Sequence, residues 1–154
     1  MTQKSPDGEV YVGFMKNGSP QGKGKVTYTD GRTYDGNWNN GIWHGYGIAK
    51  YPDGSTYSGN FDMGRRSGYG THSSGGYVYR GTFANDQMHG SGEHSYPGGD
   101  VYNGDFRNGE RHGQGAYLWA GGNQIYRGTF SSGKRTGTAV MSLNKPGESS
   151  STKL

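Results

Sequence analysis

The stretch YDGNWNNGIWHGYGIAKYPDG, residues 34–54, contains the pattern that determines the fold of this chain. It begins with a tyrosine, has glycine two residues later and tryptophan four residues later, and ends in a Pro-Asp-Gly turn. The same order of residues returns about every 23 residues along the chain. Self-similarity at such a fixed period is the sequence signature of a repeat architecture.

The repeats are marked by six lead tyrosines, each taken here as repeat position 0. Positions 2 and 11 are glycine in all six copies, and position 4 is tryptophan or phenylalanine in five of them. The lead tyrosines are Tyr11, Tyr34, Tyr57, Tyr79, Tyr102 and Tyr126. We therefore predict repeats over residues 11–33, 34–56, 57–78, 79–101, 102–125 and 126–143, the last one a partial, capping repeat. Residues 1–10 are expected to form an N-terminal lead-in or cap, and residues 144–154 a disordered tail.

Composition excludes several classes of protein. Hydrophobic residues make up only 28% of the 154 residues, but there are 13 Tyr, 5 Phe and 3 Trp, so rings supply the apolar surface. The 32 glycines disfavour helix interiors. The chain has no cysteine for disulfides, no apolar run long enough for a membrane span, and a polar N-terminus unlike a signal peptide. We expect a cytoplasmic protein. It could in addition be bound peripherally at a membrane or at the cytoskeleton.

Each repeat is predicted to form two short strands, at positions 0–5 and 12–17, joined by a longer loop that contains glycine. A tight turn then leads to the next repeat, as in Tyr51-Pro-Asp-Gly54. A three-residue loop, with a type I turn followed by a left-handed glycine, suits this sequence better than a two-residue turn. The predicted fold class is all-β: an elongated, twisted, single-layer antiparallel sheet of tandem β-hairpins, without notable helices.

The three-residue turn assigns the side chains to faces. Because side chains alternate along a strand, positions 0, 2, 4, 13, 15 and 17 share one face, which carries the Tyr and Trp/Phe rings with glycines between them. We call this surface the ring face. The opposite face carries polar residues such as Asp35, Asn37 and Ser58. A slip of one residue would invert the two faces, so the pattern fixes the register. Glycines at positions 2 and 13 leave room for rings to lie over them.

These residues resemble the MORN repeat (membrane occupation and recognition nexus), which Tyr34 to Gly54 matches almost position by position. The resemblance covers about residues 11–143. It implies an elongated single-layer sheet with one hairpin per repeat, and a use in cytoskeletal scaffolding, membrane-proximal assemblies and protein–protein binding. The repeat that begins at Tyr11 departs from the pattern, because its ring is Phe14 and its position 4 is Met15.

Two surfaces are candidate binding sites. The ring face predicts a site for a partner helix or extended peptide, and a basic edge at positions 8 and 9 predicts an anion or phosphoinositide site, with a merely solvated edge as the alternative. Trp43, also at position 9, is either an exposed partner anchor or a packed ring. The ring-face residues are Tyr34, Trp38, Tyr57, Phe61, Tyr79, Phe83, Tyr102 and Phe106. The basic residues are Arg65, Arg66, Arg111, Lys134 and Arg135.

No catalytic or metal site is predicted. Three histidines, His44, His89 and His112, occupy position 10, but equivalent positions in successive repeats lie roughly 10 Å apart, too far to share an ion. The Gly-x-Gly pairs lack the following helix that a nucleotide loop requires. We expect no cofactor and no nucleic-acid partner.

The sequence thus predicts a non-catalytic interaction or scaffolding module that binds a protein partner through the ring face. A peripheral module that binds anionic phospholipids through the basic edge is the alternative. Self-association through the end strands is a further expectation, because unpaired strand edges invite pairing.

Overall fold

The computed structural model describes residues 1–121, 124–145 and 148–153. The chain divides into two units, residues 1–75 and 76–154, which are described separately. No described residue is helical. The described part of the chain therefore contains no helix that is long and apolar enough to cross a membrane. Both units are antiparallel sheets in which strands consecutive in the sequence are neighbours, so the all-β prediction is confirmed.

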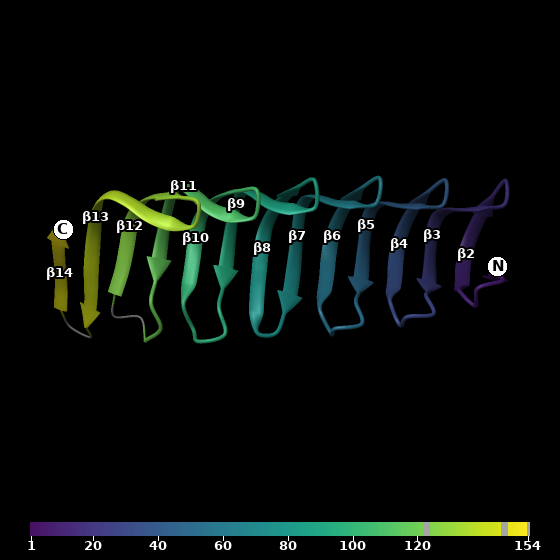
Figure 1. The fold of residues 1–154 in the computed structure, drawn as a ribbon, viewed down its shortest axis with the longest axis horizontal. Helices are drawn as coiled ribbons and strands as arrows, with labels where there is room; N and C mark the ends of the chain where they lie inside the picture. Colours follow the sequence, from purple (N-terminus) through teal and green to yellow (C-terminus); the bar gives the residue numbers. More distant parts are fainter. Residues whose placement is uncertain (122–123, 146–147, 154) are drawn as a thin grey trace. The chain divides into compact units, whose positions relative to one another are not determined.

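The N-terminal unit contains seven strands, each paired with the next along the chain (Figure 1). They are β1 (Thr2–Lys4), β2 (Val10–Lys16), β3 (Ser19–Thr27), β4 (Thr33–Asn39), β5 (Ile42–Lys50), β6 (Thr56–Asp62) and β7 (Arg65–Ser74). β1 belongs to the predicted lead-in and pairs with β2, so that Thr2 lies opposite Val12.

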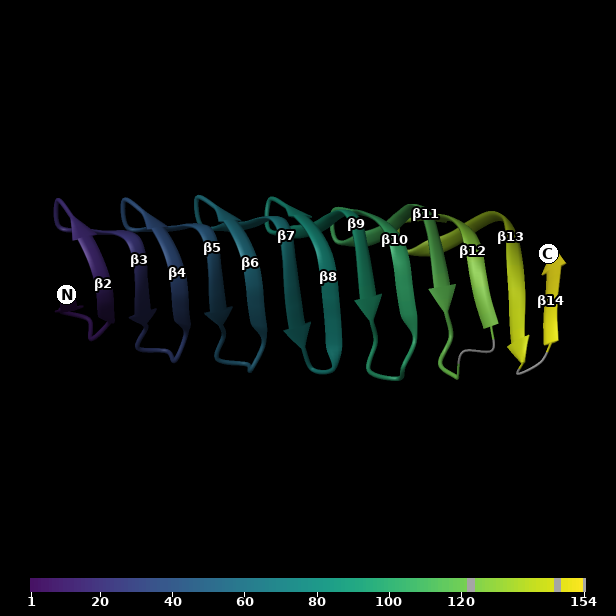
Figure 2. The ribbon, with the colours of Figure 1, turned by 180° about the vertical axis from the view of Figure 1, so that it is seen from behind.

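The C-terminal unit also contains seven strands in sequence order, and Figure 2 shows them from behind. They are β8 (Tyr77–Ala84), β9 (Gln87–Ser95), β10 (Val101–Arg107), β11 (Glu110–Leu118), β12 (Gln124–Ser131), β13 (Lys134–Lys145) and β14 (Glu148–Lys153). β14 falls in the tail predicted to be disordered, but it pairs with β13, with Lys145 opposite Glu148. The edge of β13 offers unpaired N–H and C=O groups that the tail can bond.

The turns between repeats have the predicted form. In the turn after β5, the Tyr51 N–H donates to the Ser55 carbonyl at 2.9 Å, and the Gly54 N–H donates to the Tyr51 carbonyl at 3.0 Å. Gly54 has a φ of 89°, a value that glycine adopts readily. The Asp53 carboxylate accepts hydrogen bonds from the Ser55 N–H and hydroxyl. A type I turn followed by a left-handed glycine therefore sets the register between repeats.

The connection within each repeat is shorter than predicted. Between β4 and β5 it consists of two residues, Asn40 and Gly41, with φ of 50° and 81°. Positive φ at both residues is the type I′ geometry, whose twist matches that of the flanking strands. Positions 8–11, predicted as loop, therefore pair as strand, and Ile42 lies opposite Asn39. A register shift between Gly36 and Trp38 marks a bulge in this hairpin.

The ring face holds the core, as the face assignment predicts. Tyr34, Trp38 and Ala49 are buried, whereas Tyr46 and Ile48 on the opposite face are 53% and 39% exposed. The Tyr34 ring lies directly over Gly47, and a Cβ at Gly47 would overlap the ring. Rings lying over glycines thus take the place of the second layer that an ordinary sheet packs against.

Candidate functional site

The eight ring-face residues predicted to bind a partner form the core instead. Each is at most 5% exposed, so these side chains have little surface to offer a ligand. Direct contact of these side chains with a partner stays a prediction, and their burial counts against it, because each ring is covered by its neighbours. The buried rings are Tyr34, Trp38, Tyr57, Phe61, Tyr79, Phe83, Tyr102 and Phe106.

Each lead tyrosine is fixed at both ends. The Tyr102 hydroxyl donates to the Asp105 carbonyl at 2.7 Å, three residues along its own strand, and the other lead tyrosines make the corresponding bond. Its ring meets Phe106 of the same repeat and Phe130 of the next edge-to-face, both at a centroid separation of 5.0 Å. Burial raises the pKa of Tyr102 to about 12, because the phenolate would lose its hydration.

Residues at position 9 cover the lead tyrosines from the ring-face side. Trp43 stacks on Tyr34 at 4.4 Å with an interplanar angle of 5°, and its indole N–H donates to the Tyr28 hydroxyl at 3.1 Å. These contacts support the packed alternative for Trp43 over the free anchor. In three other repeats the cap is an arginine: Arg66 over Tyr57, Arg111 over Tyr102 and Arg135 over Tyr126.

Arg111 is the most extensively held of these caps. Its guanidinium carbon lies 5.8 Å from the Tyr102 ring centroid, 5.0 Å from that of Tyr117 and 5.5 Å from that of Phe130. One guanidinium N–H donates to the Gly133 carbonyl at 2.6 Å. Cation–π contacts and this bond together fix the side chain in one geometry.

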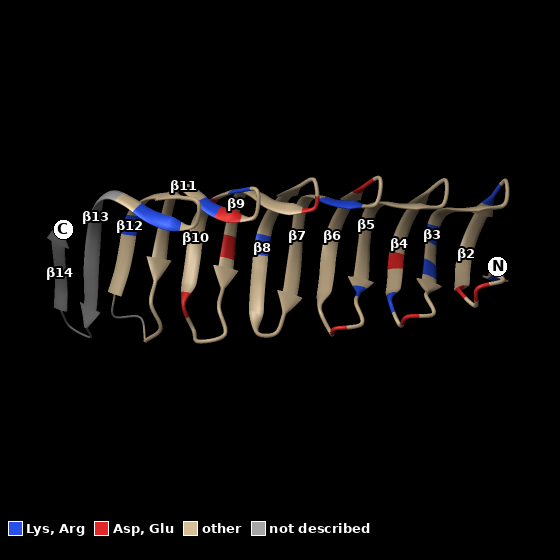
Figure 3. Ribbon diagram, in the orientation of Figure 1, with Lys and Arg blue, Asp and Glu red and all other residues tan. Residues whose placement is uncertain are grey.

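The five predicted basic residues differ in their surroundings. Figure 3 shows Lys and Arg at several hairpin turns of the sheet edge, with acidic residues among them. Arg65 and Lys134, at position 8, are exposed, and so is Arg135, at position 9. The position-9 side chains of Arg66, Arg111 and Arg135 lie over rings. Because side chains alternate along a strand, adjacent cations take different surroundings.

The surface that remains open on the ring face of the C-terminal unit is an aromatic ladder formed by five side chains. Tyr77 lies 5.9 Å from Tyr96, and His94 lies 4.5 Å from Tyr96. Tyr96 is followed by Tyr117 at 5.9 Å, and Tyr117 by Trp119 at 5.0 Å, all between ring centroids. Tyr77 is 47% exposed and the other four are half-buried. The ladder thus combines packed rings with accessible surface.

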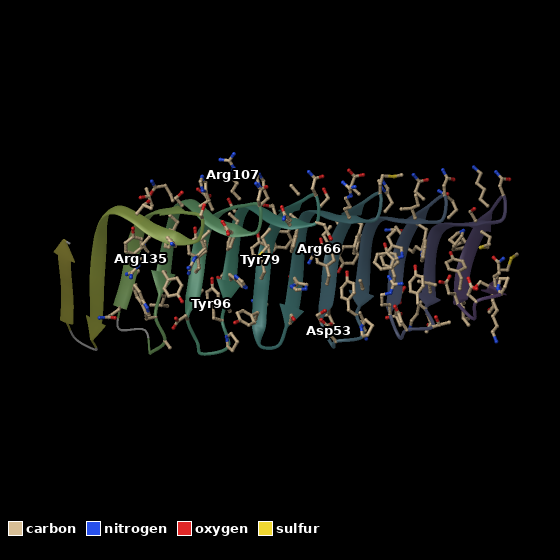
Figure 4. All side chains as sticks on the ribbon, in the orientation of Figure 1. Asp53, Arg66, Tyr79, Tyr96, Arg107 and Arg135 are labelled. Carbon is tan, nitrogen blue, oxygen red and sulfur yellow. The ribbon has the colours of Figure 1, made fainter. Side chains whose placement is uncertain are left out.

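The ladder ends in a hollow of about 440 Å³. Its lining residues are Arg111, Tyr117, Trp119, Phe130, Gly133, Lys134 and Arg135. Figure 4 shows Tyr96 lower on the strands, nearer the three-residue turns, and Arg135 higher, nearer the two-residue turns. The Arg135 guanidinium carbon lies 5.3 Å from the Trp119 ring centroid, so a cation stands beside the last ring of the ladder.

A second hollow, of about 250 Å³, lies in the N-terminal unit. Its lining residues are Gln3, Ser5, Glu9, Tyr11, Pro20, Val26, Tyr28, Trp38 and Gly41. Glu9 is the one charged residue among them. The two hollows therefore share aromatic walls but differ in charge.

The position-10 histidines have a structural role in two repeats. The Nδ1 atom of His44 accepts from the Met63 N–H at 3.1 Å, and that of His89 accepts from the Asn108 N–H at 3.4 Å. Each bond ties one hairpin turn to the next. Among the described residues, no three His, Asp or Glu side chains are grouped so as to hold a metal ion.

The sequence analysis did not predict the aromatic ladder as a binding surface. It also did not predict that position-9 side chains cover the lead tyrosines. The signal was present: Asn-Gly pairs at positions 6 and 7, such as Asn40-Gly41 and Asn108-Gly109, are typical of two-residue hairpin turns. With that turn, position 9 falls on a strand beside the lead tyrosine, where a tryptophan or arginine side chain covers the ring.

Comparisons with known proteins agree with this geometry. The family model of the MORN repeat matches residues 11–31, 34–56, 57–76, 79–101, 102–124 and 126–144. A search of the curated proteins found no match. Among solved structures, the chain is similar to the TCP domain of SAS-4 (dCPAP) of Drosophila melanogaster, determined in complex with a proline-rich motif of Ana2 (dSTIL). The TM-score is 0.61 at 12% identity, over 99% of this chain and 81% of that chain, a likeness of fold.

Proposed function

This chain belongs to the MORN repeat family, and on that premise we propose that it is a non-catalytic interaction module whose ring face binds an extended peptide or a helix of a partner protein. The observation that carries the proposal is the aromatic ladder of the C-terminal unit, in which Tyr77, His94, Tyr96, Tyr117 and Trp119 follow one another at centroid separations of 4.5–5.9 Å.

The ladder suits an extended peptide for two physical reasons. Tyrosine and tryptophan offer large apolar area at a small cost in side-chain entropy, and for this reason they are enriched at binding hot spots. Extended, proline-rich segments dock on grooves lined by aromatic rings, since their backbone is already ordered before binding. The solved structure similar in fold contains a proline-rich motif of its own partner, which gives a first class of peptide to test.

The burial of the eight predicted ring-face residues changes which variants test the proposal. Trp38→Ala would disturb the core, whereas Tyr96 and Trp119 lie in the half-exposed ladder. The matched control is Tyr46 and Tyr69, which are 53% and 60% exposed at position 12, on the opposite face.

The experiment is selection of peptides from a random display library on the full-length chain, followed by calorimetry with the selected peptides. We expect binding to be lost in Tyr96→Ser/Trp119→Ser and retained in Tyr46→Ser/Tyr69→Ser, with circular dichroism showing that both variants fold. Peptides that bind the ladder variant as tightly as the unaltered chain would refute the ring face as the site.

The lipid alternative gains less support from the structure. Three of the five predicted basic residues lie over tyrosine rings, and two of these, Arg66 and Arg111, are only partly exposed. Vesicle binding that depends on Arg65 and Lys134, the two exposed position-8 cations, would favour it.

A further inference from the structure

We propose that the hollow at the end of the aromatic ladder binds a carboxylate of the partner, so that the segment bound along the ladder is acidic. The inference rests on the proposed function, because it names the chemistry of the peptide that occupies the same face. It concerns the hollow lined by Arg111, Tyr117, Trp119, Lys134 and Arg135, which is called the cationic hollow below.

The charge of this hollow is of one sign. Arg111, Lys134 and Arg135 all line it, and no carboxylate is among the lining residues that the structure describes. Among the described side chains, none of these three cations has a carboxylate oxygen within ion-pair distance. Three cations without a carboxylate partner among the described side chains, around a cavity of about 440 Å³, favour an anionic occupant.

The carboxylate of Asp100 is bonded to a ring that lines the hollow. It accepts hydrogen bonds from the Tyr117 hydroxyl and from the Ala120 N–H, both at 2.6 Å. These donors lower the pKa of Asp100, because they stabilise its charged form. Asp100 therefore orients a ring of the hollow, and among the described side chains it makes no ion pair with the three cations.

Arg111 is held in place before any ligand binds. Its bond to the Gly133 carbonyl uses one N–H, and its guanidinium carbon lies 5.0 and 5.5 Å from the ring centroids of Tyr117 and Phe130. Arginine has five N–H donors in a rigid fork that matches a carboxylate. Ordering Arg111 therefore adds little to the cost of binding, since its conformation is already restricted.

Continuity with the ladder favours a peptide over a lipid headgroup. Tyr117 and Trp119 are ladder residues and also line the hollow, so a chain lying on the rings reaches the cations. Arg135 lies over the Trp119 ring at 5.3 Å, which places positive charge beside the apolar surface. An acidic residue flanked by proline or other apolar residues complements this arrangement.

The N-terminal unit provides an internal contrast. The hollow there, beside Tyr28, is lined by Glu9 as its one charged residue. The preference for a carboxylate is thus predicted for the C-terminal unit alone, and it does not follow from the repeat pattern as such.

The test uses the full chain and two matched proline-rich peptides of about ten residues, one with two glutamates and one with glutamine in their place. Calorimetry at low salt measures both. We expect the glutamate peptide to bind about tenfold more tightly. In Arg111→Gln/Arg135→Gln this difference falls to within about twofold. The control Lys23→Gln/Lys25→Gln removes the same charge from exposed positions of the opposite face and retains the preference.

Equal binding of the two peptides by the unaltered chain would overturn the inference and leave the proposed function standing. A preference that persists in Arg111→Gln/Arg135→Gln would also overturn it. Failure of both peptides to bind at all would count against an extended peptide on the ladder, and so against both proposals. Where Arg111→Gln disturbs folding, Lys134→Gln/Arg135→Gln serves instead, because both side chains are exposed. Binding to phosphatidylcholine vesicles is also measured, with and without phosphoinositide. Vesicle binding that depends on the arginines, without a difference between the two peptides, would show that the hollow binds a lipid headgroup.

Discussion

The repeat that begins at Tyr34 and the repeat that begins at Tyr102 cover their lead tyrosines with different side chains. In the first, Trp43 stacks on Tyr34 at 4.4 Å. In the second, the equivalent residue is Arg111, whose guanidinium carbon lies 5.8 Å from the Tyr102 ring centroid. Below both tyrosines the arrangement is the same, since each ring lies over a glycine and each hydroxyl bonds the carbonyl three residues on.

The comparison separates two functions of the repeat. The floor, which is made of tyrosine, glycine and the edge-to-face ring, is constant and supplies stability. The cap at position 9 is variable and decides whether the face is apolar or cationic above that ring. A change in the floor should therefore affect both repeats alike, and a change in the cap should affect each in its own way.

The largest effect expected on both repeats together is alkaline unfolding. Burial raises the pKa of Tyr102 to about 12, and it also raises those of Tyr34 and Tyr79 above the ordinary value. The folded chain then binds these protons more tightly than the unfolded chain, so their contribution is complete below about pH 10 and is lost as pH rises through the folded-state pKa. Circular dichroism and tyrosinate absorbance should change together above about pH 10. Full ionisation of all tyrosines with the sheet intact would contradict this prediction.

The next largest effect is expected from substitutions in the floor. Gly47→Ala and Gly115→Ala each place a Cβ against the ring of the lead tyrosine, Tyr34 or Tyr102. The ring has no free space to move into, so each change should lower the free energy of unfolding by roughly 3 kcal/mol. Urea denaturation measures both.

The control for the floor is Gly98→Ala. A Cβ at Gly98 meets nothing within 4 Å, and its φ is not in the left-handed region. The expected change is within about 0.5 kcal/mol. Similar losses at residues 47, 98 and 115 would show that the effect comes from the backbone rather than from the ring.

Substitution of the caps should distinguish the two repeats. Trp43→Ala removes a half-buried ring that contacts Tyr34 and Phe61, and should cost about 2 kcal/mol. Arg111→Ala should cost about 1 kcal/mol, because a cation–π contact contributes less. Arg111→Trp should keep the stability within about 1 kcal/mol of the unaltered chain and abolish the preference for glutamate peptides. Retention of that preference would show that Arg111 does not supply it.

The smallest expected effect is again common to both repeats. Tyr34→Phe and Tyr102→Phe remove the hydroxyl that bonds the Asn37 or the Asp105 carbonyl at 2.7 Å. Each should cost about 1 kcal/mol, the usual net contribution of such a bond. A much larger loss in one repeat would reveal a role of that hydroxyl beyond its single bond.

The fold could be predicted from the sequence because the residues that specify its turns and faces recur in successive repeats. Tyr51-Pro-Asp-Gly54 specifies the three-residue turn, and the alternation around Tyr34 and Trp38 assigns the face. The predicted length of the inner connection is wrong, because Asn40-Gly41 alone forms the turn between β4 and β5. That error hid the strand on which position 9 lies.

The site could be predicted only as a face. Sequence periodicity identifies which rings share a surface, but it does not show how much of each remains exposed after its neighbours pack. Tyr34 and Tyr102 are 0% exposed, whereas Tyr96 is half-buried, although all three lie on the ring face. The cationic hollow depends on Arg111 reaching from one hairpin to the Gly133 carbonyl of the next, a contact that spacing alone does not specify.

The lead tyrosine also determines how the sheet comes apart. Its hydroxyl bond stays within its own repeat, whereas its ring meets the Phe or Trp of the next one, as Tyr34 does with Phe61 at 5.4 Å. Within each unit, adjacent repeats therefore stabilise one another through ring contacts, as in other repeat arrays. Amide hydrogen exchange should form a gradient, fastest in a terminal hairpin and slowest in one with neighbours on both sides. Loss of one hairpin would then uncover the ring of its neighbour without unfolding it, so that opening begins at an end and proceeds one tyrosine at a time.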